Sequence, residues 1–519
     1  MLFNSFEFIL YFLPAALVAY YACRVAGFVR TSVATLALAS VFFYGWWDWR
    51  NLFILGTSIV FNYFVGRRVA RRDASAHACL IAGIAGNLLA LGFFKYYNFF
   101  AANFASATGA TARLLEFALP LGISFFTFTQ IAFLVDTWRG KAREYRFLEY
   151  LLFVSYFPHL IAGPIIHHKQ LIPQLDRRYG LSKALDDFAL GLLIFVLGLA
   201  KKVLLADNIA PFANVVFSAA ADGKPIDPIS AWTGVLAYTL QLYYDFSGYS
   251  DMAVGLSKMF GLNLPINFNA PYRATSMIDF WRRWHMTLSR FLRDYLYIPL
   301  GGNRLGKTRR YLNLLVTMVL GGFWHGAGWT FIIWGAIHGT ALAVNHLWRS
   351  VAPGWWRRAP AAVSAPLGWG LTFFVVVIGW VYFRAHDVAS ANRLLAAMFT
   401  PQTGILDGLF AMLRESVHLL RGFGWRDVLF TLLGSTANLV PRFGLIPSVQ
   451  FLLLLPILLV LSAAGPTALV AACRIRHTFA TPGWFAQARG LAAVGATALL
   501  LFICLGRLNN ATEFLYFQF

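Results

Sequence analysis

Long apolar stretches separated by short polar segments make up most of this chain. A helix that crosses a bilayer needs roughly 20 mainly apolar residues, because it rises about 1.5 Å per residue through about 30 Å of hydrocarbon. The stretches do not alternate with a period of two, which disfavours a transmembrane β-barrel. Candidate stretches lie near residues 6–24, 31–47, 51–66, 78–97, 117–136, 147–166, 187–206, 230–247, 311–348, 366–383, 451–473 and 487–506. The pattern predicts an all-α polytopic membrane protein with about ten to twelve transmembrane helices.

Composition favours lipid as the solvent for these stretches. Of the 519 residues, 59% are hydrophobic and 13% are charged, whereas a soluble globular domain carries about 25% charged residues. So few charges could not cover a core of this size in water. No soluble domain or low-complexity tract interrupts the pattern, so we predict one integral-membrane domain over residues 1–519.

The net charge of +21 is compatible with nucleic-acid binding, but its distribution favours a membrane topology. Basic residues gather in short loops between apolar stretches, as the positive-inside rule describes. No basic and aromatic ribbon or zinc-finger spacing accompanies them. The clusters are Arg67, Arg68, Arg71 and Arg72, then Arg139, Lys141, Arg143 and Arg146, then Arg304, Lys307, Arg309 and Arg310. We predict no nucleic-acid partner and place these loops in the cytoplasm.

The topology alternates regularly until residue 147. The N-terminal MLFNSFEFILYFLP lacks the basic segment of a signal peptide, so we expect a retained helix with its N-terminus outside. A full crossing at 147–166 would place the basic loop that follows it outside the cell. The stretch also contains Gly163 and Pro164. We therefore predict a re-entrant segment, since irregular backbone at membrane depth is tolerated where protein or a cavity surrounds it.

Two segments are more polar than the rest. Residues 262–310 are rich in Arg and Lys, and we predict a cytoplasmic interfacial segment there. Apolar residues at three- and four-residue steps within it predict one amphipathic helix: Trp281, Trp284, Leu288, Phe291 and Tyr295. Residues 385–450 form a second amphipathic segment, predicted as a loop or short surface helices without assigned chemistry.

The stretch 311–348 contains the main candidate for chemistry. As one helix it would exceed about 50 Å, longer than one bilayer crossing. Glycines at 321, 322, 326 and 328 surround His325 and predict a break there. Ionisable residues at membrane depth are costly and are therefore functional candidates, and an imidazole can accept a proton from a hydroxyl near neutral pH. The alternative is a histidine that only packs between helices.

The other polar candidates give weaker signals. His285 lies at the edge of the predicted amphipathic face, where an interfacial role is the simpler interpretation. His338 and His346 do not have the i, i+4 spacing of a helical metal pair, and the adjacent His167 and His168 point to different faces of a helix.

Carboxylates and cysteines add no further chemistry. Asp245 and Asp251 are six residues apart and do not share a helix face, so paired-carboxylate catalysis is weakly supported; bonds to Arg side chains or to the backbone around Gly248 are the alternative. The four cysteines do not form a CxxC pair, so we predict no disulfide framework and no metal site.

Three classes of protein remain open from the residues alone. They are an enzyme centred on His325, a transporter or channel with His325 in a proton path, and a non-catalytic scaffold. No P-loop, GxGxxG or GxSxG motif occurs, which disfavours nucleotide-driven transport by this chain. A proton relay needs several intramembrane ionisable groups, and the apolar stretches contain few.

The motifs YYDFSGYSDMAVG (243–255), FNAPYRATSMIDFWRRWHMTLSRFLRDYLYIPLGGNR and GGFWHGAGWTFIIWGAIHG resemble, in this order, the membrane-bound O-acyltransferase (MBOAT) family. The N-terminus, the stretch VYFRAHDVASANRLLAAMF at 381–399 and the close EFLYFQF are similar to its bacterial alginate O-acetylase branch. The resemblance covers essentially the whole chain.

This resemblance implies a site and a reaction. The family's essential intramembrane histidine falls on His325 and a second family histidine on His285. The family fold is a ring of helices around a thin centre with a tunnel between the two membrane faces. The implied reaction moves an acetyl group from acetyl-CoA, or a thioester derived from it, to a hydroxyl, with no bound cofactor.

The resemblance leaves the acceptor open. It implies a bacterial inner-membrane enzyme that works in the lipid bilayer with periplasmic polysaccharide-acetylation proteins. The acceptor is expected to be an alginate-like exopolysaccharide or a periplasmic carrier partner. Cellulose, peptidoglycan and teichoic acid are the alternative acceptors.

Overall fold

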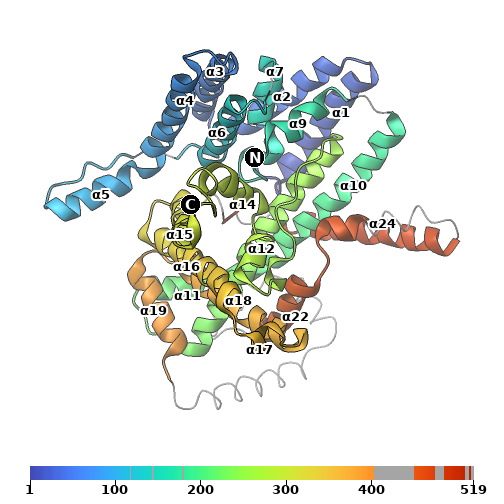
Figure 1. The fold of residues 1–519 in the computed structure, drawn as a ribbon. Coiled ribbons are helices and arrows are strands. Elements are labelled where there is room, and N and C mark those ends of the chain that lie inside the picture. The colour runs from blue at the N-terminus through green and yellow to red at the C-terminus, as the bar shows by residue number, and fades with distance from the viewer. Residues whose placement is uncertain are drawn as a thin grey trace. The chain divides into compact units, whose positions relative to one another are not determined.

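The computed structural model describes residues 1–116, 119–142, 145–177, 180–401, 449–473, 484–508 and 514–515. Among these residues the regular secondary structure is helical and includes no strand (Figure 1). The all-α fold class predicted from the apolar stretches is therefore confirmed. The chain divides into two compact units that are interleaved along the sequence, and the single integral-membrane domain stays a prediction.

The first unit comprises Met1–Leu199, Tyr249–Asn267 and Ala468–Phe519. It contains most of α10, the end of α12 and the C-terminal α24. The helices that begin in it are η1 (Glu7–Phe12), α1 (Leu13–Val25), α2 (Val29–Gly45), α3 (Arg50–Ala70), α4 (Ala76–Leu91), η2 (Gly92–Tyr96), α5 (Tyr97–Thr108), α6 (Ile123–Trp138), α7 (Phe147–Ser155), α8 (Phe157–Leu160), α9 (His168–Leu175), α10 (Leu181–Ala200) and α24 (Trp484–Leu505).

The second unit comprises Ala200–Gly248 and Phe268–Thr467 and contains every candidate residue near His325. Its long helix α12 continues into the first unit. The helices that begin in it are η3 (Lys201–Ala206), α11 (Asp207–Ala221), α12 (Pro228–Met259), η4 (Pro271–Arg273), α13 (Met277–Trp281), α14 (Met286–Leu292), η5 (Arg293–Tyr297), α15 (Gly306–His325), α16 (Trp329–Val351), α17 (Gly354–Arg357), α18 (Ala361–Arg384), α19 (Val388–Phe399) and α22 (Val449–Ala464).

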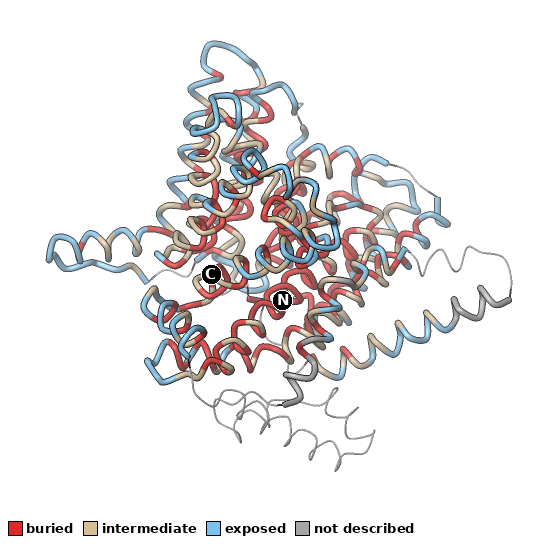
Figure 2. The backbone as a smooth tube through the Cα atoms, turned by 60° about the horizontal axis from the view of Figure 1, so that its bottom comes forward, coloured by how far each residue is buried: buried red, intermediate tan, exposed pale blue. Residues whose placement is uncertain are grey.

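Several helices are suited to a lipid environment. By length and composition, four stretches of the described residues could cross a membrane: Glu7–Val25, Ala76–Thr108, Leu181–Ala221 and Ala361–Arg384. Several of their large apolar side chains, among them Val18, Leu89 and Leu371, are largely exposed, and α5 carries mainly exposed positions (Figure 2). Contact with water would be unfavourable for such surfaces, whereas contact with lipid is not. The chain is a multi-pass membrane protein, and ten to twelve crossings stays a prediction.

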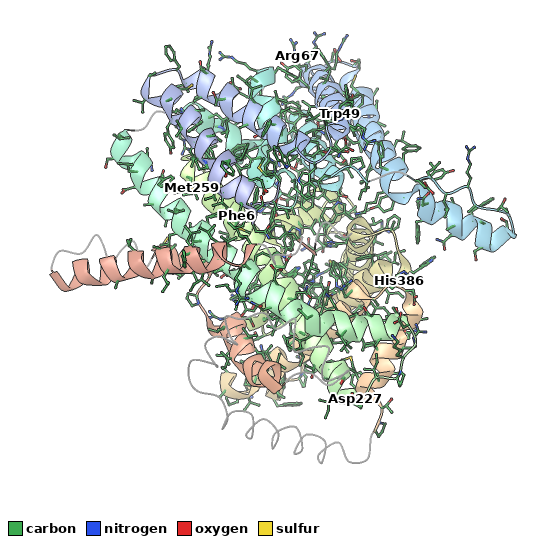
Figure 3. All side chains as sticks on the ribbon, turned by 180° about the vertical axis from the view of Figure 1, so that it is seen from behind. Phe6, Trp49, Arg67, Asp227, Met259 and His386 are labelled. Atoms are coloured by element: carbon green, nitrogen blue, oxygen red, sulfur yellow. The ribbon has the colours of Figure 1, made fainter. Side chains whose placement is uncertain are left out.

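Helix α3 has an aromatic residue before its first turn and basic residues in its last turn. It is 21 residues long, and Arg67 and Arg68 lie in its last turn. Trp49 precedes its first residue, and Figure 3 marks Trp49 and Arg67 near its two ends. Aromatic residues favour the membrane interface, and basic residues favour the cytoplasmic side. This placement agrees with the predicted cytoplasmic position of the first basic cluster.

The predicted re-entrant segment 147–166 is broken into short pieces. Helix α7 has nine residues and α8 has four, with non-helical backbone at Tyr156 (φ −52°, ψ 109°) between them. Nine residues extend about 13 Å along a helix axis, less than half of the hydrocarbon thickness. No single helix in this segment could therefore cross the bilayer.

The single amphipathic helix predicted through Trp281 and Tyr295 is wrong. The chain forms α13, a turn at 282–285 and then α14. The cause is local, because His285 has left-handed backbone dihedrals (φ 41°, ψ 54°) that an α-helix cannot continue through. The predicted apolar face is nevertheless buried at Trp281, Trp284 and Leu288.

The predicted break in 311–348 is confirmed. Helix α15 ends at His325, Gly326–Gly328 form the connection, and α16 begins at Trp329. The two helices pack side by side over their length (Figure 1). Glycine permits this approach, because a Cβ at Gly322 would lie 2.2 Å from the Phe331 carbonyl oxygen and one at Gly335 would lie 2.4 Å from the Met318 carbonyl oxygen.

Gly322→Ala should therefore destabilise the protein. The added methyl group meets backbone, which cannot move aside as a flexible side chain can, and overpacking of this kind costs about 1–3 kcal/mol. We expect a lower thermal unfolding midpoint for the detergent-purified variant. Gly370→Ala on α18 is the matched control, because nothing lies within 4 Å of its Cβ position. An unchanged midpoint for Gly322→Ala would contradict the close packing of α15 and α16.

Candidate active site

His325 is the last residue of α15 and lies in an aromatic enclosure. Its side chain is 6% exposed. Its ring centroid is 4.8 Å from that of Trp324, 5.2 Å from that of Trp334 on α16, and 5.2 Å from that of Phe383 on α18. Three helices of the second unit therefore surround the imidazole with ring surfaces. A group that reacts there would be largely shielded from bulk water.

His285 lies next to His325, although the two are 40 positions apart in the sequence. Their ring centroids are 6.4 Å apart, and His285 is fully buried. The ring of Phe246 on α12 packs edge-on against His285 at 4.8 Å. The structure thus brings together the two histidines that the sequence motifs singled out. Their catalytic roles stay a prediction.

The turn that presents His285 is held by backbone hydrogen bonds. The Asn269 N–H donates to the Arg283 carbonyl oxygen at 2.9 Å, and the Ser289 N–H donates to the His285 carbonyl oxygen at 3.0 Å. Left-handed backbone at a residue other than glycine costs of order 1 kcal/mol and is enriched at functional sites. The strained backbone is therefore a stronger indication of a functional role for His285 than its position on the predicted apolar face was.

Burial also affects the charge of His285. The residue lies in the turn between α13 and α14, outside the four stretches that could cross a membrane. Burial lowers the pKa of its imidazole to about 3. The ring is therefore uncharged at neutral pH. A neutral imidazole donates one hydrogen bond and accepts another, which suits a positioning role.

A third histidine, His338, belongs to the same aromatic cluster. It is fully buried one turn after Trp334 on α16, and the two ring centroids are 4.8 Å apart. His338 lies within one of the sequence motifs. From the sequence, we concluded only that its spacing from His346 does not suit a helical metal pair. Its neighbours lie on α13 and α18 and could not be identified from sequence spacing.

A buried ionic network supports the part of α12 that contacts His285. The Lys202 ammonium lies 2.7 Å from a carboxylate oxygen of Asp207 and 2.7 Å from one of Asp245. Lys202 is 1% exposed and Asp245 is 2% exposed. Asp245 therefore pairs with a lysine, a partner that the sequence interpretation did not name. The sequence missed Lys202 because it lies in an apolar stretch 43 positions before its partner.

Three other histidines considered in the sequence have different neighbours. His167 and His168 lie near Asp136 in the first unit, with Nδ1 to carboxylate distances of 3.8 and 3.9 Å. His346 contacts Arg310. Within the described ranges, no group of three or more His, Cys, Asp or Glu side chains is arranged to hold a metal ion.

Comparison with known proteins decides the family. The profile of the MBOAT, membrane-bound O-acyltransferase family, matches residues 137–385. The chain is 43% identical over 428 residues to a peptidoglycan O-acetyltransferase of Helicobacter pylori, covering 77% of this chain and 80% of that protein. The chain belongs to the MBOAT family.

Other relatives of this chain are named for different acceptors. A probable alginate O-acetylase of Azotobacter vinelandii is 43% identical over 413 residues, covering 77% of this chain and 78% of that protein. A teichoic acid D-alanyltransferase of Streptococcus thermophilus is 30% identical over 246 residues, covering 46% and 59% of the two chains. This MBOAT protein is an O-acyltransferase, which decides against the transporter and scaffold interpretations.

Lys202→Met should unfold or strongly destabilise this MBOAT protein. Removing one partner leaves buried carboxylates without a counter-charge, which costs about 3–5 kcal/mol. We expect a large drop in the thermal unfolding midpoint, partly recovered by adding Asp207→Asn and Asp245→Asn. Lys224→Met is the control, because Lys224 and Asp222 form an exposed pair that contributes little. Equal midpoints for the Lys202 and Lys224 variants would contradict a stabilising role for the network.

Proposed function

We propose that this protein moves an acetyl group from a cytoplasmic thioester donor to a hydroxyl group on the far side of the inner membrane. The donor is acetyl-CoA or a thioester derived from it. The acceptor is an alginate-like exopolysaccharide or a periplasmic carrier partner. The observation that carries the proposal is the pair of buried imidazoles, with ring centroids 6.4 Å apart, inside the aromatic enclosure.

His325 is the proposed general base. Its imidazole takes the proton from the attacking hydroxyl while the hydroxyl oxygen bonds to the thioester carbonyl carbon. The tetrahedral oxyanion then collapses and breaks the carbon–sulfur bond. The leaving thiolate takes the proton back from the imidazolium. The ordinary pKa of such a thiol is about 8.5. The products are an O-acetyl ester and a free thiol, and the imidazole is regenerated.

The tight enclosure favours a small acyl group. Trp324, Trp334 and Phe383 are each at most 4% exposed, and their rings lie about 5 Å from His325. An acetyl group needs less room between these rings than a longer acyl group does. His285, across from His325, positions either the donor carbonyl or the acceptor hydroxyl. No cofactor is required, because the thioester itself supplies the activated acyl group.

Peptidoglycan is the second candidate acceptor. The relative from Helicobacter pylori is named as a peptidoglycan O-acetyltransferase and matches this chain at the same identity as the probable alginate O-acetylase. Both acceptors present sugar hydroxyls, so the same chemistry at His325 serves either one. Cellulose and teichoic acid are less favoured by the comparisons.

His325→Ala in the native host should abolish O-acetylation while leaving the protein in the membrane. We would quantify O-acetyl groups on secreted polysaccharide and on peptidoglycan fragments, and follow the protein by immunoblot of the membrane fraction. The polymer that loses acetyl groups identifies the acceptor. His386→Ala is the matched control, because its side chain is 82% exposed (labelled in Figure 3). Unchanged acetylation at normal protein level would refute His325 as the base.

A further inference from the structure

Several buried nitrogen-bearing side chains beside the His325 enclosure have no hydrogen-bond partner in the described protein. Three of them are His338, at both ring nitrogens, and Trp281 and Trp334, at their indole N–H groups; the indole N–H of the neighbouring Trp380 is a further one. The exposed fractions of His338, Trp281 and Trp334 are 0%, 8% and 1%. Buried polar groups in folded proteins are nearly always paired. Three such groups in one cluster therefore point to a partner that the protein chain does not supply.

The three side chains form one contact cluster. The His338 ring centroid lies 4.8 Å from Trp334 and 5.4 Å from Trp281, and the two indoles are 5.9 Å apart. Trp334 also contacts His325 at 5.2 Å. The cluster therefore adjoins the candidate base through a shared side chain, and α13 and α16 together supply its members.

Packing explains where the His338 ring lies but not why it is a histidine. Gly379 on α18 admits the ring, because a Cβ there would lie 2.8 Å from Nε2. A phenylalanine or leucine could fill most of that space without a desolvated nitrogen. Each unpaired buried polar group costs about 1–3 kcal/mol. Retaining several of them in one cluster is typical of a site that binds a polar ligand.

The hydrogen-bonding groups of these three side chains indicate what kind of ligand they could bind. An indole N–H can only donate, and a neutral imidazole donates from one nitrogen. The cluster thus offers three donors to a ligand atom that accepts, and none of them carries a full charge. An oxygen atom that gains negative charge during the reaction fits this set.

We propose that His338, Trp281 and Trp334 form an oxyanion-binding subsite for the carbonyl oxygen of the acyl donor. This inference rests on the proposed acetyl transfer. When the hydroxyl oxygen bonds to the carbonyl carbon, the carbonyl π pair moves onto oxygen, and the three N–H groups donate hydrogen bonds to it. When the carbon–sulfur bond breaks, the pair returns and the thiolate leaves. The subsite gains and loses no proton.

The test uses His338→Phe and Trp281→Phe in lipid nanodiscs with acetyl-CoA as the probe. Release of free CoA thiol is measured with water alone and with de-O-acetylated alginate oligosaccharide as the acceptor. Loss of an oxyanion donor reduces kcat about 10²-fold or more. We expect that drop in both assays, with little change in the KM of either substrate, because the carbonyl oxygen is common to hydrolysis and transfer. His338→Gln keeps an N–H group and should retain more activity than His338→Phe.

Trp232→Phe is the matched control. Its indole N–H already donates to the Met398 carbonyl oxygen at 2.9 Å, so it should leave kcat unchanged. Thermal unfolding midpoints separate catalytic from structural effects. If the His338 and Trp281 variants lose stability but keep kcat, the polar groups bind only water and the inference is overturned.

Two other outcomes would also decide the question. If the KM of the oligosaccharide rises while hydrolysis is unchanged, the cluster binds the acceptor hydroxyl, and the carbonyl assignment is overturned. If the wild-type protein releases no thiol from acetyl-CoA with either acceptor, direct transfer from acetyl-CoA is refuted, and the subsite for its carbonyl oxygen is refuted with it. Normal wild-type turnover with normal variants overturns the subsite alone.

Discussion

Helices α15 and α16 approach so closely that a methyl group at Gly322 or Gly335 would collide with a carbonyl oxygen of the opposite helix. The position of the site depends on this contact. The hairpin places His325, the last residue of α15, against Trp334 in the second turn of α16. Once Trp334 is fixed, the residue one helical turn later, His338, must lie on the same face of α16. A wider separation of the two helices would move His325 away from its enclosure and from the neighbouring aromatic cluster.

A buried ionic network holds the part of α12 that lies against His285. Lys202 faces two carboxylates, and one of them, Asp245, precedes Phe246, whose ring packs on His285. Buried ion pairs are seldom a large net source of stability, but an unmatched partner is costly. The network therefore selects one position of α12 over others. That position keeps the ring of Phe246 against His285 and so helps to orient the second histidine of the site.

The elements that could be predicted from the sequence are those set by local pattern. The break around His325 follows from four glycines within an apolar stretch that is too long for one crossing. The all-helical fold follows from the composition and lengths of the stretches. The single amphipathic helix through Trp284 was wrong because periodicity gives no sign that His285 adopts left-handed backbone. Lys202 and the ring contacts of His338 were missed for a related reason. Both depend on partners distant in sequence, and spacing along one element carries no information about them.

The chemistry proposed for the enclosure follows from the aromatic rings that surround His325. A general base works well when it is neutral before the reaction and charged only in the transition state. In the proposed reaction, a lysine or arginine that stabilised the oxyanion would repel the imidazolium as it forms. Neutral N–H donors avoid that repulsion and still stabilise the oxygen, since their dipoles are oriented before the reaction and act strongly where water is excluded. Tryptophan and neutral histidine are the side chains that combine a large apolar surface with such a donor, and they are the side chains that line this part of the protein.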